Sequence, residues 1–341
     1  MKVAVAVSGG ADSLYALHAL REQGHELCAL HGRFAPVAHQ AEAALLDLCK
    51  GLGLKLHVAN IEKSFARHVI EPFVAAYAAG KTPNPCAHCN ALIKFGLLLD
   101  MARELGAQAL ATGHYALFAP HPCYGPALRS ATDPCRDQSY FLALVPRDRL
   151  EAALFPLANV IKNDVYTRLA EQGLAVPLPD ESREICFVPN DDYRAFLAGR
   201  LAALPGKGNI QMRNGSVIGQ HQGLWRYTEG QRKGLGLAWG EPLYVLEKVQ
   251  ESNSLIVGPA SELPVNSCCA GSVNLLVEPA LGPARVLVRT RYRQEAAAAD
   301  VSLAGCTLRI DFHCPQAPPA PGQLACVYDE QGWVLAGGII Q

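Results

Sequence analysis

The stretch Ser8-Gly9-Gly10-Ala11-Asp12-Ser13 joins two segments whose apolar residues follow different periods. The residues before it, from Val3 to Val7, form a continuous apolar run, which is typical of a buried strand. After the stretch, apolar residues recur at threefold spacing, which predicts a helix with Leu14, Leu17 and Leu20 on one face. The sequence therefore predicts a strand, a tight glycine turn and the first turn of a helix.

The predicted turn has the features of a phosphate site. Gly9 and Gly10 permit positive φ and close backbone approach, and either Asp12 or Ser13 can cap the helix. Free backbone N–H groups and the positive end of the helix dipole would then point into one concavity. A plain turn followed by a plain cap is the alternative, since the motif is neither the dinucleotide fingerprint nor the Walker loop. The motif does resemble the pyrophosphatase loop of enzymes that split ATP between its α and β phosphates.

The composition limits the classes of protein. The 341 residues suffice for about two or three domains, and 50% of them are hydrophobic, which permits a substantial core. The net charge of -1 leaves any nucleic-acid contact to local basic patches. The longest apolar runs are too short to span a membrane, and the N-terminus lacks the pattern of a signal peptide. We therefore expect a cytoplasmic protein without a membrane partner, whose 12 cysteines are mostly thiols.

Residues 1 to about 115 alternate predicted strands and helices, and this order predicts a doubly wound parallel sheet. The expected strands cover 3–7, 26–31, 55–61 and 107–111. Ligands of such sheets bind beyond the carboxyl ends of the strands. We therefore expect three loops to meet at one edge, and these are Ser8–Ser13, the segment after His31, and Gly113-His114.

The second half of the chain has a different pattern. Residues 146–204 are mostly helical in pattern, and the cluster Pro205-Gly206-Lys207-Gly208 predicts a linker. Short β-type segments with turn signals follow, which predicts small antiparallel sheets or a barrel. The expected strands are 216–218, 242–248, 254–257, 284–290, 307–312, 324–328 and 333–340. The predicted domains are 1–204, 205–262 and 263–341.

The second informative stretch is the loop Gly80-Lys81-Thr82-Pro83-Asn84-Pro85-Cys86-Ala87-His88-Cys89-Asn90. We expect Asn90 to cap a helix over 91–105 and so to place Cys89 at its N-terminus, where a thiolate is stabilised. A C-x-x-C is also often half of a zinc site, but no second C-x-x-C and no H-x-x-x-H follows. A redox or sulfur-handling pair, or an incomplete cluster site, fits better. Cys186, which lies between two apolar residues, by itself indicates a small buried side chain.

Two basic patches are candidates for RNA contact. Arg289, Arg291 and Arg293 alternate, so that they would share one face of a strand. Residues 207–233 hold five basic residues and one acidic residue. Such patches can supply phosphate contacts, although a solvated charged face is the plainer explanation of either patch alone.

Taken in order along nearly the whole chain, these residues make the sequence similar to the tRNA-specific 2-thiouridylase family. The matching pieces are S-G-G-A-D-S, T-P-N-P-C-A-H-C-N-A-L-I-K-F-G, A-T-G-H-Y-A, R-D-Q-S-Y-F-L, I-C-F-V, Y-T-E-G-Q-R-K-G-L-G, R-T-R-Y-R-Q, P-G-Q and L-A-G-G-I-I. The ordered series is far more specific than any one member. The resemblance implies an ATP-binding α/β domain of the PP-loop type, similar to adenine nucleotide hydrolases, a small central domain and a C-terminal antiparallel β-barrel.

The resemblance also implies a reaction. ATP, with Mg2+, would adenylate the C2 oxygen of the anticodon wobble uridine and release pyrophosphate, and a sulfur nucleophile would then displace AMP to give 2-thiouridine. The partners would be a tRNA and a sulfur donor or relay protein. The positions that match the family's ATP site are Ala6, Val7, Ser8, Gly9, Gly10, Ala11, Asp12, Ser13, Gly32 and Gly113.

The family's sulfur chemistry maps onto two cysteines. Cys186 would carry sulfur as a persulfide, and Cys89 would attack that persulfide or close a disulfide with Cys186. The target base must leave the anticodon stack, because C2 of a stacked base is hard to reach. The positions that match the family's tRNA contacts are Asn84, Pro85 and Cys86 at the flipped base, and His114, Arg136, Asp137, Gln138, Arg291, Tyr292 and Gln323 elsewhere.

Two departures from the family pattern bear on the mechanism. Many members have Asp at the position of Cys86, so that Cys86, Cys89 and Cys186 form a set of three thiols here. Three thiolates can hold a [4Fe–4S] cluster whose open iron delivers sulfur, and the cluster and persulfide routes both stay open. The second departure is the segment His31-Gly32-Arg33-Phe34, which replaces the family's longer polar segment.

Two other classes of function stay open at this point. An enzyme that adenylates a different carbonyl with the same loop, such as an amidating synthetase, would release pyrophosphate without tRNA. A non-catalytic RNA-binding protein whose cysteines hold structural zinc would bind tRNA without turning over ATP. The basic, β-rich half of the chain disfavours the first class, and the S-G-G-A-D-S turn disfavours the second.

Overall fold

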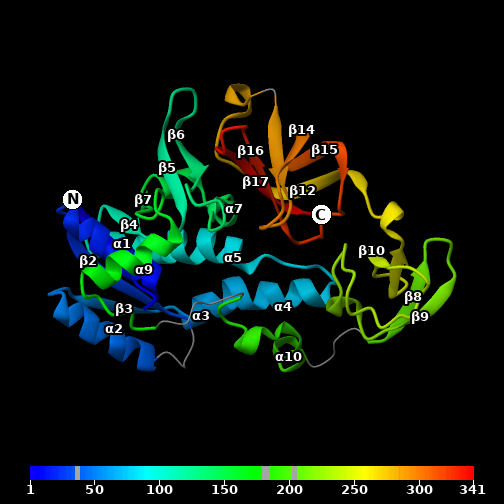
Figure 1. The fold of residues 1–341 in the computed structure, drawn as a ribbon, viewed down its shortest axis with the longest axis horizontal. Coiled ribbons are helices and arrows are strands. Elements are labelled where there is room, and N and C mark those ends of the chain that lie inside the picture. Colours follow the sequence, from blue (N-terminus) through cyan, green and yellow to red (C-terminus); the bar gives the residue numbers. More distant parts are fainter. Residues whose placement is uncertain (35–38, 179–184, 202–205, 284) are drawn as a thin grey trace.

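The computed structural model describes residues 1–34, 39–178, 185–201, 206–283 and 285–341. Three parts follow one another along the chain (Figure 1): a parallel sheet with helices on both faces, a small four-stranded sheet and a closed barrel. This arrangement confirms the expected fold class. The expected domain boundary between residues 204 and 205 lies outside the described residues. Among the helices in the described ranges, none has the length and apolar character needed to cross a membrane.

The parallel sheet has the strand order β3-β2-β1-β4-β7. Its strands are β1 (Lys2–Ala6), β2 (Glu26–Arg33), β3 (Leu56–Asn60), β4 (Ala109–Ala111) and β7 (Ala153–Leu154). All neighbouring strands run parallel, and β1 lies between β2 and β4. The strand order reverses next to β1, and in such a sheet the ligand crevice lies beyond the carboxyl ends at that point.

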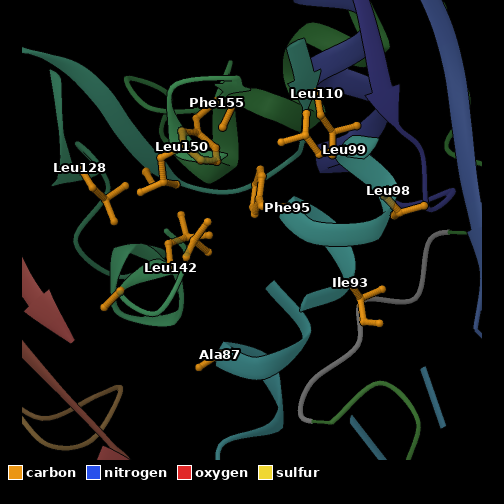
Figure 2. Packing of buried hydrophobic residues seen from close by; sticks show 14 of the residues in the cluster. Ala87, Ile93, Phe95, Leu98, Leu99, Leu110, Leu128, Leu142, Leu150 and Phe155 are labelled. Atoms are coloured by element: carbon orange, nitrogen blue, oxygen red, sulfur yellow. The ribbon is translucent and has the colours of Figure 1, made fainter. Parts of the chain in front are cut away.

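Helices cover both faces of this sheet. α1 (Ala11–Glu22), α2 (His39–Gly51) and α9 (Lys162–Glu171) share one apolar cluster with Val3 of β1. The next residue, Ala4, points to the opposite face because successive strand side chains alternate, and it belongs to the second cluster. There the helix over 85–104 packs on the sheet, and Figure 2 shows Phe95 on the side of this helix that faces Leu150 and Phe155.

The two long helices of this part contain π-helical segments. The helix over 62–78 runs through α3 (Glu62–Phe65), η2 (Ala66–Ile70) and α4 (Glu71–Ala78), and the helix over 85–104 runs through α5 (Pro85–His88), η3 (Cys89–Leu98) and α6 (Leu99–Glu104). η2 and η3 are π-helices, in which an amide donates to the carbonyl five residues back. Pro72 is the second residue of α4, directly after the π-helical segment η2 ends.

Shorter elements connect the sheet to the second half of the chain. They are β5 (Ala116–His121), β6 (Gly125–Ser130), α7 (Ser139–Leu142), α8 (Arg147–Leu150), η4 (Pro189–Asp191) and α10 (Tyr193–Ala198). β5 and β6 form an antiparallel hairpin that the sequence analysis did not predict. The hairpin is held by the barrel, since Tyr124 and Ala127 belong to the barrel's apolar cluster.

The small sheet has the order β10-β11-β8-β9. It consists of β8 (Gly208–Met212), β9 (Val217–His221), β10 (Tyr244–Val249) and β11 (Ser254–Gly258), with η5 (Leu224–Arg226) and η6 (Ala260–Glu262) in its connections. The expectation of purely antiparallel pairing is wrong here, because β11 and β8 run parallel.

The barrel closes through the order β12-β15-β14-β13-β16-β17, with every neighbouring pair antiparallel. Its strands are β12 (Val265–Leu275), β13 (Val286–Arg289), β14 (Ala297–Ala304), β15 (Thr307–Gln316), β16 (Leu324–Tyr328) and β17 (Val334–Ile340), and η7 (Pro279–Leu281) follows β12. β12 and β14 were not among the expected strands. The alanine-rich run of β14 has helical propensity, and pairing with β13 and β15 overrides it.

Candidate active site at the edge of the parallel sheet

The turn between β1 and α1 has the predicted backbone. Gly9 has a φ of +93°, a conformation that side chains rarely adopt. A Cβ at this position would also lie 2.8 Å from Leu178 Cδ1. Glycine is therefore required here both by the turn and by the neighbouring chain.

The start of α1 differs from the expectation that Asp12 or Ser13 caps it. Gly10 is the N-cap, and among the residues that the structure describes no side chain caps the helix. The Ser13 hydroxyl instead donates to Gly10 O at 2.9 Å and accepts from Ser8 N at 3.2 Å. Because no side chain caps them, the first amides of α1 can serve an anion such as phosphate.

Asp12 faces α9 rather than its own helix end. Lys162 Nζ donates to both carboxylate oxygens, at 2.8 and 2.9 Å, and the Tyr115 hydroxyl donates to Oδ1 at 2.8 Å. Lys162 is the first residue of α9 and is only 5% exposed. Burial and the Asp12 carboxylate raise the pKa of Tyr115, so that its hydroxyl stays a donor. The sequence analysis missed Lys162, whose only signal was its place at the start of a helix.

Gly113 lies directly against this turn. A Cβ at position 113 would be 2.9 Å from Asp12 C and 3.0 Å from Ser13 N, so that any side chain would displace the turn. The carboxyl ends of β1 and β4 therefore meet as the parallel sheet predicts. Gly32 lies within β2, where a Cβ would be 3.0 Å from Ile61 Cδ1, and packing alone accounts for a glycine there.

His114 connects this edge to the helix over 85–104, which carries Cys86 and Cys89 and which we call the cysteine helix. It is buried, its Nδ1 lies 2.7 Å from Thr112 Oγ1, and its Nε2 lies 3.2 Å from Lys94 Nζ. Burial, and then the positive charge of Lys94, hold the pKa of His114 well below its ordinary value, so that the ring is neutral. Since an ammonium only donates, Nε2 accepts from Lys94 and Nδ1 carries the proton toward Thr112. The sequence analysis did not single out Lys94.

The cap of the cysteine helix also differs from the expectation. Asn84, not Asn90, is the N-cap, and its Oδ1 accepts from Ala87 N at 3.1 Å. Asn90 lies inside the helix, where its side chain donates to Phe141 O at 3.0 Å. The helix therefore begins more than a turn earlier than expected, and Cys89 does not lie at its N-terminus.

Burial dominates the charge of the two helix cysteines. It raises the pKa of Cys86 to about 11 and that of Cys89 to about 12, while the positive charge of Lys94 lowers both. The expected stabilisation of a Cys89 thiolate by a helix N-terminus is thus absent, and desolvation favours the neutral thiol.

Cys186, which is remote in sequence, lies within electrostatic range of these two cysteines. The charge of Cys186 acts on both Cys86 and Cys89, and the charge of Lys94 acts on Cys186 in turn. Cys186 is exposed, so the interpretation of an isolated buried side chain is wrong, although the surrounding protein still raises its pKa. We call Cys86, Cys89 and Cys186 the thiol cluster.

A donor set of cysteines alone is the one that iron–sulfur clusters use. Within the described residues, however, no three His, Cys, Asp or Glu side chains are arranged to hold a metal ion. In the arrangement that the structure shows, the thiol cluster does not fit a preformed metal centre. A [4Fe–4S] cluster on Cys86, Cys89 and Cys186 stays a prediction.

Several residues expected to contact tRNA have partners within the chain. Asp137 is buried and accepts from Ser139 N at 3.1 Å and from Ser139 Oγ at 2.9 Å. Gln138 N donates to Tyr115 O at 2.7 Å, and Tyr115 N donates to Gln138 Oε1 at 3.0 Å. The ring of Tyr292 packs on Phe141 with centroids 4.4 Å apart. These contacts order the segment around residue 136, whose arginine is exposed.

Gln323 of the barrel contacts residues 80–84, which lead into the cysteine helix and which we call the cysteine loop. Its Nε2 donates to Thr82 O at 3.0 Å and to Pro83 O at 3.1 Å. The backbone adds a third link, from Thr82 N to Pro321 O at 2.8 Å. The barrel therefore fixes the two residues directly before Asn84.

The small sheet holds the same loop from another side. Lys248 and Glu229 form a buried ion pair at 3.2 Å, and Lys248 Nζ lies 3.5 Å from Thr82 Oγ1. Arg291 of the barrel donates to Glu229 O and, at 3.2 Å, to Pro318 O. The cysteine loop is thus a junction at which all three parts of the chain meet.

The fold and the site define a PP-loop nucleotide-binding protein with two further β domains. Three family models match consecutive segments: a tRNA methyl transferase HUP domain over residues 1–190, a tRNA methyl transferase PRC-barrel domain over 194–259, and an aminomethyltransferase beta-barrel domain over 265–340. A curated tRNA-specific 2-thiouridylase MnmA from Lawsonia intracellularis is 51% identical, covering 100% of this chain and 99% of the relative. Its counterpart from Nitratidesulfovibrio vulgaris is 51% identical with the same coverage. This chain belongs to the tRNA-specific 2-thiouridylase family.

A solved structure, the U34-tRNA thiolase NcsA from Methanococcus maripaludis with its [4Fe-4S] cluster, is a more distant likeness. It is 16% identical with a TM-score of 0.38, over 58% of this chain and 64% of that one. This likeness is too remote to inform the site.

Proposed function

We propose that this chain is a tRNA 2-thiouridylase, which adenylates the C2 oxygen of the anticodon wobble uridine and then replaces AMP by sulfur. The observation that carries the proposal is the position of Gly113-His114. Gly113 touches the nucleotide turn at Asp12, and His114 touches Lys94, whose charge acts on every member of the thiol cluster. Phosphate binding and sulfur chemistry therefore share one edge of the sheet.

The first step needs ATP held by its phosphates. The uncapped start of α1 offers amides to them, and Lys162 supplies a buried positive charge beside the turn. We propose that Mg2+ accompanies ATP and that Asp12 is the carboxylate nearest to it. The C2 oxygen attacks the α-phosphorus, the bond to the bridging oxygen of the β-phosphate breaks, and pyrophosphate leaves.

The second step moves one sulfur atom. A sulfur donor or relay protein loads the exposed Cys186 as a persulfide, whose terminal sulfur attacks C2 while AMP leaves with the former C2 oxygen. The Cys89 thiolate attacks Cys186 Sγ, and the electron pair of the broken S–S bond stays on the sulfur that is now bound to C2. A disulfide joins Cys89 and Cys186, and a thiol reductant must restore both thiols before the next round.

The tRNA must present its wobble base to this edge. The base leaves its stack and approaches Asn84, Pro85 and Cys86, which directly follow the two residues that Gln323 contacts. The exposed Arg136 is a candidate phosphate contact, whereas His114, Asp137 and Gln138 would act through the backbone that they order. A tRNA substrate is consistent with a cytoplasmic location.

The test uses the full chain with ATP, Mg2+, a persulfide donor and a tRNA that carries an unmodified wobble uridine. We expect 2-thiouridine in the digested tRNA. Cys186→Ser should lower thiolation by at least about a hundredfold and keep tRNA-dependent pyrophosphate release, because it removes only the sulfur step. Cys123→Ser, at an exposed thiol outside the thiol cluster, is the matched control and should keep both activities.

Two outcomes contradict the proposal. Pyrophosphate release that needs a small acceptor and no tRNA identifies another adenylating synthetase. Binding of tRNA with no ATP turnover and one bound zinc per chain identifies a non-catalytic RNA-binding protein.

A further inference from the structure

The three alternating arginines of the barrel do not form one basic patch. The strand β13 ends at Arg289, so the three side chains do not share a strand face as expected. Arg289 Nη1 lies 3.4 Å from Asp137 Oδ2, Arg291 donates to Glu229 O, and Arg293 is exposed. Two of the three arginines therefore contact other parts of the chain, and Arg289 contacts the part that contains the parallel sheet.

The guanidinium of Arg289 lies between an aromatic ring and a carboxylate. Its Cζ is 5.2 Å from the centroid of the Tyr328 ring, on the neighbouring strand β16. The side chains of Arg289 and Asp137 are 22% and 4% exposed, and 152 positions of sequence separate them. Arg289 Nε is buried and has no hydrogen-bond partner among the described residues. The ring and the carboxylate are thus the contacts that hold this charge.

Asp137 in turn organises the loop over 131–139. Its Oδ1 accepts from Ala131 N and from Ser139 N, both at 3.1 Å, and its Oδ2 accepts from Ser139 Oγ at 2.9 Å. One carboxylate therefore joins the two ends of the loop. A buried carboxylate that loses its positive partner is strongly destabilised, so removal of the charge of Arg289 should loosen the loop at both ends.

This geometry differs from that of a phosphate contact. Such a contact must bring an uncompensated positive charge to the RNA, whereas Arg289 is largely covered and its charge is balanced by Asp137. Arg136, which lies between the two ends of the loop, is exposed. The exposed arginine is therefore carried by the loop, and the covered arginine holds the carboxylate that orders it.

We propose that Arg289 is a positioning residue, which fixes the loop over 131–139 through Asp137 and thereby places Arg136 toward the tRNA, and that Arg289 does not itself contact RNA. The consequence for tRNA rests on the proposed function, whereas the order of the loop does not depend on it.

The first test measures hydrogen exchange by mass spectrometry on the full chain without tRNA. In Arg289→Met, we expect peptides that cover 131–139 to exchange at least about tenfold faster than in the unmodified chain, because the loop opens more often. Arg289→Lys keeps the charge and should give an intermediate rate. Arg285→Met, at a barrel arginine whose side chain is 79% exposed, is the matched control and should exchange as the unmodified chain does.

The second test measures steady-state pyrophosphate release with ATP and tRNA. We expect Arg289→Met to raise the KM for tRNA about tenfold and to change kcat and the KM for ATP by less than about twofold, because only the placement of a tRNA contact is altered. Arg289→Lys should again be intermediate, and Arg285→Met should match the unmodified chain.

The outcomes separate this proposal from its alternatives. Unaltered exchange in Arg289→Met overturns it, and a raised KM for tRNA without faster exchange identifies Arg289 as an RNA contact. Faster exchange on adding Arg289→Met to Asp137→Asn also overturns it, because the effect would then not pass through Asp137. If Arg289→Met unfolds, Arg289→Gln decides by the same criteria. Faster exchange in a chain that forms no 2-thiouridine retains the role of Arg289 in the loop and loses the proposed function.

Discussion

Lys162 and Asp12 form a bidentate ion pair, at 2.8 and 2.9 Å, across 150 positions of sequence. The lysine side chain is 6% exposed and the carboxylate is 32% exposed, so that the acid faces the nucleotide edge and the base lies behind it. A buried lysine is costly without a partner, and Asp12 is the partner in this structure. A phosphate that binds at this edge must share Lys162 with Asp12, and a metal ion must share Asp12 with Lys162.

The first prediction concerns this pair. Lys162→Met keeps the volume of the side chain and removes its charge. We expect tRNA-dependent pyrophosphate release to fall about a hundredfold, the scale on which one preorganised charge acts on a developing phosphate anion. Pyrophosphate is measured with a coupled assay on the folded variant, with Lys50→Met as the control. Unchanged release would mean that Lys162 serves only to neutralise Asp12.

The second prediction is a loss of stability in acid that depends on His114. Its pKa in the folded state lies well below its ordinary value near 6.5, so the unfolded state binds more protons as the pH falls below that value. Stability that is present above about pH 6.5 is therefore lost as the pH falls, by at most about 1.4 kcal/mol per pH unit for this group. The His114→Gln variant does not titrate here, and its thermal midpoint should fall less between pH 7.5 and pH 5.5.

The unmodified chain provides the reference for that measurement. His88 and His221 also have lowered pKa values through burial, and they contribute the same acid sensitivity to both proteins. Equal shifts of the midpoint in the two proteins would show that His114 is protonated in the folded state.

The third prediction separates the two sulfur routes. The persulfide route uses Cys89 and Cys186 only, so the Cys86→Ser variant should keep at least about a tenth of the thiolation rate, the loss reflecting small changes in base position. Thiolation is measured on protein purified anaerobically, together with its absorption spectrum and iron content. Abolished thiolation in Cys86→Ser, combined with about four irons per unmodified chain, would favour the cluster route instead.

The fourth prediction concerns the junction at the cysteine loop. Lys248 and Glu229 are 2% and 8% exposed, and their pair lies beside Thr82. Lys248→Met alone leaves a buried carboxylate unpaired and should lower the free energy of unfolding by about 3 kcal/mol. The double variant Lys248→Met with Glu229→Gln should lose clearly less, because no uncompensated charge remains. Urea unfolding measures these two variants and Glu229→Gln alone, and a loss in the double variant equal to the sum of the two single losses would show that the two residues do not interact.

Much of the nucleotide edge could be predicted from local pattern. An apolar run, two glycines and a threefold apolar spacing specify strand, turn and helix within a few residues, because each signal depends on the nearest neighbours alone. The meeting of Gly113 with the turn followed from topology, since parallel strands place their carboxyl ends at one edge. The family could also be predicted from the sequence, because its motifs run in order along the chain.

The errors arose where two local choices were nearly equivalent. Asn84 and Asn90 are both suitable caps, and the chain uses Asn84, after which Pro85 takes the first helical position that suits proline. β14 is rich in alanine, and only barrel closure makes it a strand. Lys94 and Lys162 were missed for a related reason. The role of a lysine depends on the group that it contacts, and that group is remote in sequence here.

The sequence by itself determined the PP-loop turn, the parallel sheet, the succession of three parts and the family, because hydrophobic period, glycine position and motif order are written along the chain. Only the tertiary structure decided that Asp12 pairs with Lys162, that Lys94 contacts His114, and that the charge of Cys186 acts on Cys86 and Cys89. These relationships depend on distances across the fold and on desolvation, which vary with what surrounds each group and not with its neighbours in sequence.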